Sequence, residues 1–219
     1  MLTYIVNALY KTGRTEESLQ YAEKLKEGME EYNQLLFDKY YFFYYNSLVI
    51  NYSRKNIEKA IAILEKLKTD EKIRNFSFYK VFIYTNLALL LFIRQDYYNA
   101  FQHINRLYLL TEYETVDASV KMKIALAELI IRYELGDYDV LRRRLKQVGK
   151  DYEEFLQTKE FARESIFLNV LNSMNESVDP KHDPKVQESV KSFGQRFPTE
   201  SGVEEELIDY NEWVAGKVR

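Results

Sequence analysis

Apolar side chains recur at helical spacing along most of the chain. In one clear stretch, Tyr84, Leu87, Ala88 and Leu91 are separated by three, one and three residues. That spacing places all four side chains on the same face of an α-helix. The pattern predicts an amphipathic helix in which this face is buried.

A second amphipathic run follows after a very short connection. Asp96 is a residue type that often caps the N-terminus of a helix, and Ala100, Ile104 and Leu107 follow it at helical spacing. Two helices joined by two or three residues have to pack against each other in antiparallel orientation. We therefore expect a helical hairpin in this part of the chain.

The hairpin pattern repeats along the chain. An aromatic residue stands near the end of each expected first helix, at Tyr10, Tyr52, Phe92 and Tyr133. Four residues later come Arg14, Asn56, Asp96 and Asp137, and four residues after these come Ser18, Ala60, Ala100 and Leu141. Successive aromatic residues are 42, 40 and 41 residues apart. Regular periods of about 20–50 residues indicate stacked arrays of like units.

The last part of the chain continues the pattern less regularly. Residues 161–174 read as a further first helix, and Asp183 followed by Pro184 reads as the start of its partner. Ser201 and Glu204 have the spacing of a capping box, which predicts a last helix that runs towards Val218. Its apolar side contains Val203, Leu207, Tyr210, Trp213 and Val214. Such a helix can cover the end of a stack.

The N-terminus shows no comparable cover. Leu2, Ile5, Val6 and Leu9 already belong to the first helix of a hairpin. We therefore expect the sequence to be a fragment of a longer chain.

Composition supports helices and excludes several other classes. The 219 residues include only 7 glycines and 3 prolines, too few for the many turns of a β-sandwich or barrel. Cysteine is absent, which excludes a disulfide framework and thiolate sites and is typical of a cytoplasmic protein. The net charge of −3 argues against nucleic acid as a direct partner. No uncharged run, residues 81–93 included, reaches the about 20 apolar residues of a membrane span, so we expect no membrane insertion.

No set of residues suggests catalysis. His103 and His182, the only histidines, lack metal-ligand spacing to a second ligand. The adjacent glutamates at 16–17 and 30–31 diverge on a helix and make poor acid–base pairs. No phosphate-binding or nucleophile motif occurs. The sequence therefore predicts no enzyme, no metal and no cofactor.

Two unusual runs allow two interpretations each. The six consecutive aromatic residues from Tyr40 to Tyr45 either form an interior helix with hydroxyls that reach water, or present a patch for a partner, including a second copy of the chain in a homodimer. The arginines at 142–144 point in different directions around a helix. They either form a solvated surface with local salt bridges or contact an anionic partner.

These hairpins, with a small residue early in the second helix, resemble tetratricopeptide repeats (TPR). The residues that carry the resemblance are Tyr84, Leu87, Ala88, Leu91, Ala100, Ile104 and Leu107, with Gly136, Asp137 and Tyr138 at a turn. The units depart from the family in length, since tetratricopeptide repeats have about 34 residues. Leu141 also replaces a small residue, and Leu25, Leu67, Leu107 and Val148 stand where alanine is common.

The resemblance implies a concave groove formed by the first helices, which binds an extended peptide or a partner's helix. By register, the groove is lined by Asn7, Tyr10, Tyr45, Val49, Tyr52, Leu89, Phe92, Ile130 and Tyr133. The column aromatics Tyr10, Tyr52, Phe92 and Tyr133 can instead pack against the next hairpin. A clamp for a C-terminal carboxylate is disfavoured: Asn7 and Asn46 match it, but Thr3, Phe82 and Asn86 stand where basic residues are needed.

We therefore expect an all-α, right-handed solenoid of about five antiparallel hairpins, closed by a C-terminal capping helix. Residues 1–175 would form the hairpin array, and residues 176–219 the degenerate last hairpin helix and the capping helix, in one continuous domain. The expected function is a non-catalytic scaffold that binds a partner protein or peptide in the aromatic groove. The alternative is a sensory segment of a larger regulator, which binds a peptide and controls an attached output domain.

Overall fold

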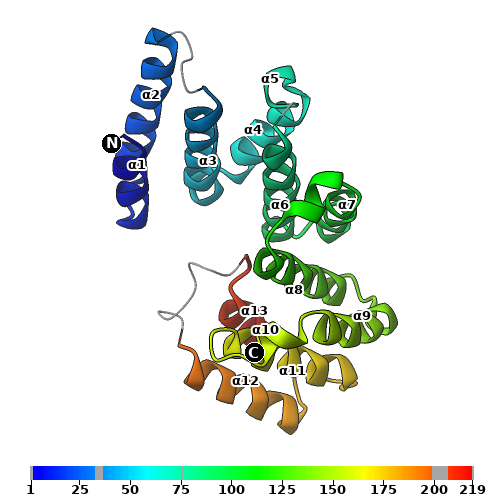
Figure 1. Cartoon of the computed structure of the whole chain (residues 1–219). Coiled ribbons are helices and arrows are strands. Elements are labelled where there is room, and N and C mark those ends of the chain that lie inside the picture. Colours follow the sequence, from blue (N-terminus) through cyan, green and yellow to red (C-terminus); the bar gives the residue numbers. More distant parts are fainter. Residues whose placement is uncertain (1, 33–36, 75, 199–206, 219) are drawn as a thin grey trace. The chain divides into compact units, whose positions relative to one another are not determined.

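The computed structural model describes residues 2–32, 37–74, 76–198 and 207–218, and within these ranges it is all-helical, with no strand (Figure 1). The helices are α1 (Leu2–Lys11), α2 (Thr15–Glu31), α3 (Phe37–Lys55), α4 (Ile57–Thr69), α5 (Glu71–Arg74), α6 (Ser77–Ile93), α7 (Tyr97–Tyr108), α8 (Ala118–Glu134), α9 (Tyr138–Asp151), α10 (Glu153–Leu156), α11 (Ala162–Glu176), α12 (Pro184–Arg196) and α13 (Tyr210–Val218), with a 3₁₀ helix, η1 (Thr111–Thr115). The expected helical class is confirmed.

The residues at the repeat positions end and begin helices as expected. Tyr10, Phe92 and Tyr133 are each the second-last residue of a first helix, and Tyr52 lies in the last turn of α3. The second column, Arg14, Asn56, Asp96 and Asp137, directly precedes α2, α4, α7 and α9. The third column, Ser18, Ala60, Ala100 and Leu141, is fully buried.

Three of the four turns share one backbone geometry. In the first, the N–H of Gly13 donates to the carbonyl of Tyr10 at 3.0 Å, and the N–H of Arg14 donates to that of Leu9 at 2.8 Å. This pair of hydrogen bonds is the Schellman motif, which needs a residue with positive φ. That residue is Gly13 (φ 74°), Gln95 (φ 63°) or Gly136 (φ 75°) in the three turns. The second turn along the chain, which ends α3, has no such residue, and Asn56 caps α4 by accepting the N–H of Lys59.

The chain divides into two compact units, Met1–Asp96 with Asn105–Glu114 (unit 1), and Tyr97–Ile104 with Thr115–Arg219 (unit 2). The division falls within α7. Residue 175, the last of the expected hairpin array, lies in α11, within unit 2.

In unit 1, consecutive helices pack in pairs and each pair packs on the next. α1 packs on α2, α3 packs on α4, and α2, α1 and α3 meet one another (Figure 1). α4 then packs on α6. The core that joins α3, α4 and α6 contains Val49, Ala60, Leu64, Leu67 and Leu87, among others.

A buried polar contact joins the first two pairs of unit 1. Asn51 donates through Nδ2 to Ser18 Oγ at 2.9 Å and to the carbonyl of Ser47 at 2.8 Å. Ser18 in turn donates to the carbonyl of Val6 at 2.9 Å. Buried polar groups are costly unless they are hydrogen-bonded, so this chain favours one register between α1, α2 and α3.

In unit 2, α8 packs on α9, and α11 packs on both of them and on α12. Every residue of α8 from Ile124 to Ile131 is buried. A helix that is buried on all sides is expected to be apolar all round, and α8 carries one buried charge in this stretch, Glu128.

Three connections between helix pairs contain short helices of their own. Short helical turns, α5, η1 and α10, lie between α4 and α6, between α7 and α8, and between α9 and α11. These extra turns lengthen the corresponding repeats beyond a plain hairpin.

The C-terminal helix begins later than the sequence predicted. The capping box at Ser201 and Glu204 lies outside the described residues. Leu207 and Ile208 are not helical, and α13 starts at Tyr210, where Asp209 Oδ1 accepts the N–H of Glu212 at 2.9 Å. By contrast, Asp183 caps α12 as expected, accepting the N–H of Lys185, with Pro184 as the first helical residue.

Candidate interaction surfaces

The residues expected to line the groove do not all reach the surface. Asn7 is exposed, and Tyr10, Tyr45, Tyr52, Leu89 and Phe92 are half-buried. Val49, Ile130 and Tyr133, however, are buried. The nine residues also divide between the two units, with Ile130 and Tyr133 in unit 2 and the others in unit 1.

The three buried residues pack against identifiable parts of the structure. Val49 belongs to the core between α3, α4 and α6. Ile130 lies in the stretch of α8 that is buried on all sides. Tyr133 contacts the indole ring of Trp213 edge-on, with ring centroids 5.3 Å apart. These three side chains therefore contribute to packing rather than to an open surface.

Two of the repeat aromatics, Tyr10 and Tyr52, form cation–π contacts. The guanidinium of Arg54 lies 4.4 Å from the ring centroid of Tyr10, and Lys59 Nζ lies 3.9 Å from that of Tyr52. Lys59 also donates to the Tyr52 hydroxyl at 2.6 Å. These contacts occupy one face of each ring.

The aromatic run from Tyr40 to Tyr45 is mainly interior. None of its six side chains is fully exposed, and Tyr44 is buried. Tyr41 donates to Asp70 Oδ2 at 3.0 Å, and Tyr44 donates to Glu23 Oε1 at 3.1 Å. Burial, and next the hydrogen bond with Tyr45, raises the pKa of Tyr41 above its usual value. The hydroxyls of Tyr41 and Tyr44 therefore take part in packing within unit 1, where each is hydrogen-bonded to a carboxylate.

Four phenylalanines from the first helices α3 and α6 lie close together in unit 1 and are partly open to solvent. We call Phe42, Phe43, Phe78 and Phe82 the phenylalanine surface. The ring centroid of Phe42 lies 4.9 Å from that of Phe78, 5.1 Å from that of Phe82 and 6.0 Å from that of Phe43, all edge-to-face. Phe78 is 62% exposed, and the other three are half-buried.

Two polar residues of α6 close to this surface already have partners. Asn86 lies one turn after Phe82 and donates to its carbonyl at 2.8 Å. Lys80, on the same helix, is paired with Glu112 Oε1 at 2.5 Å. The surface thus offers aromatic rings and few free charges, which suits apolar side chains of a partner.

In unit 2, α13 lies against the first helices. Its Tyr210 ring stacks on Phe167 of α11, with centroids 4.0 Å apart and planes 11° apart. Trp213 contacts Tyr133 at the end of α8 and lies 6.1 Å from Phe167. Because α13 reaches α8, it covers more than the last helix pair.

A single carboxylate binds two side chains of α13. Glu134 Oε1 accepts the indole N–H of Trp213 at 2.5 Å and pairs with Lys217 Nζ at 2.5 Å. Glu134 is the last residue of α8, directly after the column aromatic Tyr133. Burial, and then the neighbouring Tyr138 and Glu134, raises the pKa of Tyr133 to about 12.

A second polar anchor holds the start of α13. Asn211 Nδ2 donates to the carbonyl of Phe197 at 2.6 Å, and Arg163 Nη1 donates to the same carbonyl at 3.1 Å. This carbonyl belongs to the C-terminal cap of α12.

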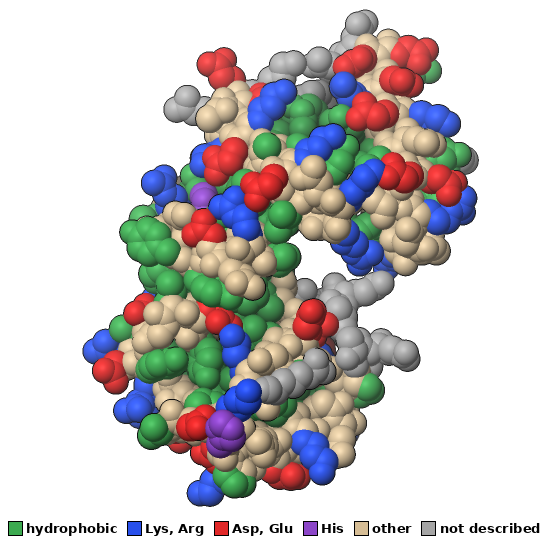
Figure 2. Space-filling view, turned by 180° about the vertical axis from the view of Figure 1, so that it is seen from behind, with side chains coloured by type: hydrophobic (Ala, Val, Ile, Leu, Met, Phe, Trp, Pro, Cys, Tyr) green, Lys and Arg blue, Asp and Glu red, His purple; other side chains and the backbone are tan. Residues whose placement is uncertain are grey.

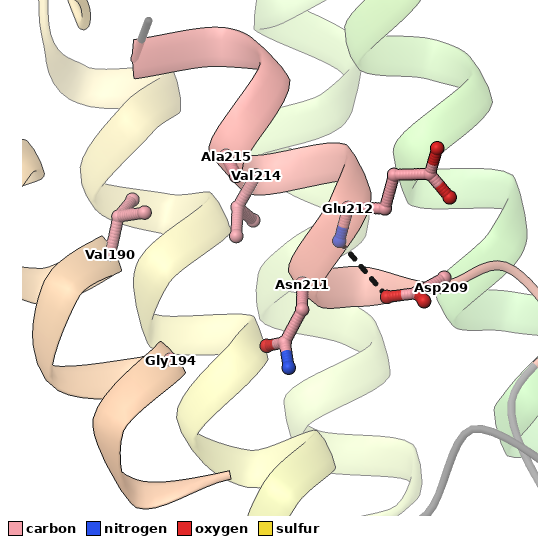
Figure 3. A pocket seen from close by; sticks show the side chains of 7 residues that line it. All are labelled: Val190, Gly194, Asp209, Asn211, Glu212, Val214 and Ala215. Atoms are coloured by element: carbon pink, nitrogen blue, oxygen red, sulfur yellow. Dashed lines mark hydrogen bonds between the residues drawn. The ribbon is translucent and has the colours of Figure 1, made fainter. Parts of the chain in front are cut away.

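A cleft of about 410 Å³ lies between α12 and α13. Figure 3 shows Val190 and Gly194 on α12 and, across from them, Val214, Ala215 and Asn211 on α13. Asp209 and Glu212, at the start of α13, also line the cleft. The packing of α13 on α12 therefore leaves open space beside the helix.

The arginines at 142–144 do not act as one surface. Arg142 and Arg143 are exposed, whereas Arg144 contacts the buried Glu128 on α8, with Nε 3.0 Å from Oε2. Arg132 binds the other carboxylate oxygen at 2.7 Å. Charged side chains of both signs are interspersed on the face of the molecule in Figure 2.

Sequence reasoning missed Phe78, Trp213 and Glu134 as functional candidates. The i, i+4 spacing of Phe78 and Phe82 on an already apolar helix carried a weak signal for the first. Nothing in the sequence paired Trp213 with Glu134, because they are 79 residues apart.

Comparisons and searches give no family for this chain. Among the described residues, no group of three or more His, Cys, Asp and Glu side chains is placed to bind a metal, and no helix is long and apolar enough to cross a membrane. No family model, curated protein or solved structure matches the sequence. The geometry thus defines a class, an all-helical protein of consecutively packed helix pairs.

Proposed function

We propose that this protein is a non-catalytic interaction scaffold, which binds a partner protein or peptide through the phenylalanine surface of unit 1. The observation that carries the proposal is Phe78, whose ring is 62% exposed and lies edge-to-face against Phe42, which also contacts Phe82. An exposed aromatic ring over other aromatic rings costs free energy in water and is typical of interaction hot spots.

The proposed architecture is a right-handed, tetratricopeptide-like stack. Its support is the pattern of contacts within each unit: α1 contacts α3 and α8 contacts α11, each a first helix against the next first helix. The second helices α2 and α9 also contact the next first helix. Stacked helix pairs present the first helices on a common face, where a partner can bind a preformed surface at a low entropic cost.

The test compares two variants with similar exposure. Phe78→Ala removes the exposed ring of the surface, and Tyr98→Ala removes a ring that is 64% exposed on the second helix α7. Both changes are expected to alter the free energy of unfolding by less than about 0.5 kcal/mol.

Partners are identified by affinity purification and mass spectrometry with the wild-type chain. We expect Phe78→Ala to weaken capture of a specific partner at least about ten-fold, which corresponds to about 1.4 kcal/mol, while Tyr98→Ala leaves it unchanged. Equal capture by all three chains, with both variants folded, would remove the phenylalanine surface from the function.

A further inference from the structure

α13 is bound to unit 2 as a peptide ligand is bound to a groove. The helix has nine residues, and isolated helices of that length are unstable in water. Its helical state therefore depends on the contacts that it makes with α8, α11 and α12. Four of its side chains, Tyr210, Trp213, Val214 and Lys217, follow the i, i+3, i+4, i+7 spacing by which amphipathic helices bind grooves.

The apolar anchors of α13 are deeply inserted. Tyr210 is 1% exposed, Val214 is 2% exposed and Trp213 is 8% exposed. Phe167 contributes to the pocket of both rings, since it stacks on Tyr210 and meets Trp213 at 68°. These are features of a binding hot spot, in which large aromatic side chains are fully desolvated.

The polar anchor supplies specificity. Glu134 accepts a hydrogen bond from the indole of Trp213 and forms a salt bridge with the ammonium group of Lys217, four residues later. Its side chain is 10% exposed, so both bonds form in a largely water-excluded place. A helix without the Trp N–H and the Lys charge would leave this carboxylate without partners.

We propose that this face of unit 2 is a binding site for amphipathic helices of the pattern Tyr-x-x-Trp-x-x-x-Lys, and that α13 occupies it as an internal competitor of a partner protein's helix. The proposal is independent of the phenylalanine surface, because the site lies wholly within unit 2. An attached helix acts at an effective concentration in the millimolar range, so a partner helix binds only when it competes with α13.

The experiment uses the full chain and a synthetic peptide. A fluorescein-labelled peptide with the sequence of residues 207–218 is titrated into the wild-type chain and into a Trp213→Ala chain, and binding is followed by fluorescence anisotropy. We expect the peptide to bind the variant at least ten-fold more tightly than the wild type, because the variant's own α13 has lost its main anchor.

Two controls assign the binding to this site. A peptide in which the residue equivalent to Trp213 is alanine should bind the Trp213→Ala chain at least ten-fold more weakly than the parent peptide. Adding Glu134→Ala to the Trp213→Ala chain should weaken the parent peptide to a similar extent. Equal affinity of the parent peptide for the wild-type and Trp213→Ala chains, or no effect of either control, would overturn the proposal.

The remaining outcomes are also decisive. Circular dichroism will show whether Trp213→Ala loses helix beyond α13. If it does, the titration is repeated with Lys217→Ala, a change at a partly exposed cation, which is expected to give a smaller gain in peptide affinity. No gain in affinity would count against the site. If light scattering shows a dimer of the wild-type chain that Trp213→Ala abolishes, the occupant is α13 of a second copy, and the proposed partner helix is wrong.

Discussion

Gln95 occupies the position at which Gly13 and Gly136 end two other first helices. All three residues have φ between 63° and 75°, a region in which a side chain on Cα is strained. Added side chains at Gly13 and Gly136 would meet no atom within 4 Å, so the cost at these turns comes from the backbone alone. The third turn of the series therefore carries a strain that the other two avoid.

We predict that Gln95→Gly raises the free energy of unfolding by about 0.5–1 kcal/mol, because glycine adopts positive φ without strain. Gln95→Ala is the matched control and should give no such gain, since alanine keeps the Cβ atom. Urea unfolding followed by circular dichroism measures both. A Gly variant no more stable than the Ala variant would contradict the strain argument.

Glu128 is the residue whose loss should be most costly in unit 2. It is 1% exposed and joins Arg132 and Arg144, whose side chains are 15% and 23% exposed. We expect Glu128→Gln to lower the free energy of unfolding by about 2–3 kcal/mol, because two partly buried guanidinium groups would lose the carboxylate that they share. Arg144→Gln should cost less, since Arg132 still pairs with the carboxylate. Equal unfolding midpoints for Glu128→Gln and the wild type would contradict this.

At the scale of elements, the contact between α8 and α13 should make stability depend on alkaline pH. The pKa of Tyr133 is raised to about 12 in the folded chain, against about 10 for an unfolded tyrosine. The neutral phenol is therefore favoured by folding. Its contribution to stability is fully present below about pH 10 and is lost as the pH rises towards 12.

We predict that the wild-type chain loses stability between pH 10 and 12 more steeply than Tyr133→Phe, which cannot ionise. Burial also raises the pKa of Tyr97 and Tyr152, so the variant should reduce the loss without abolishing it. Urea unfolding at intervals across this range measures the difference. The same pH dependence in both chains would contradict the role of Tyr133.

The helix pairs were predictable because their signals are local. The apolar spacing of residues 84–91, the cap at Asp183 and the glycines at 13 and 136 each act within a few residues, and the structure confirms the helices that they predict. The start of α13 was mispredicted because a capping-box pattern at residue 201 was extended through Leu207 and Ile208, where the chain is not helical.

The open and covered faces of the first helices were not predictable from the sequence. Tyr133 stands in the last turn of α8, as the repeat pattern predicted. Whether that side chain meets solvent depends on Trp213, which is 80 residues further along the chain. Such contacts follow from tertiary packing and leave no trace in local spacing.

At the scale of the molecule, the two compact units set how a change in one place is felt in another. Glu128 lies in unit 2, and the Ser18–Asn51 contact lies in unit 1. Packed units with their own cores often open separately.

We predict that Glu128→Gln speeds hydrogen exchange of the backbone amides of α8, α9 and α11 and leaves those of α1 to α4 unchanged. Mass spectrometry of peptides from each unit measures this. Equal acceleration in both units would show that the chain opens as one cooperative body.

The chain contains a single tryptophan, and that residue is the main anchor of its last helix. Excitation at the red edge of protein absorbance would therefore address one indole, wedged between Tyr133, Phe167 and the carboxylate of Glu134. The wavelength of its fluorescence emission would report whether α13 is packed on unit 2 or exposed to water. This fluorescence measurement needs no dye, tag or second mutation.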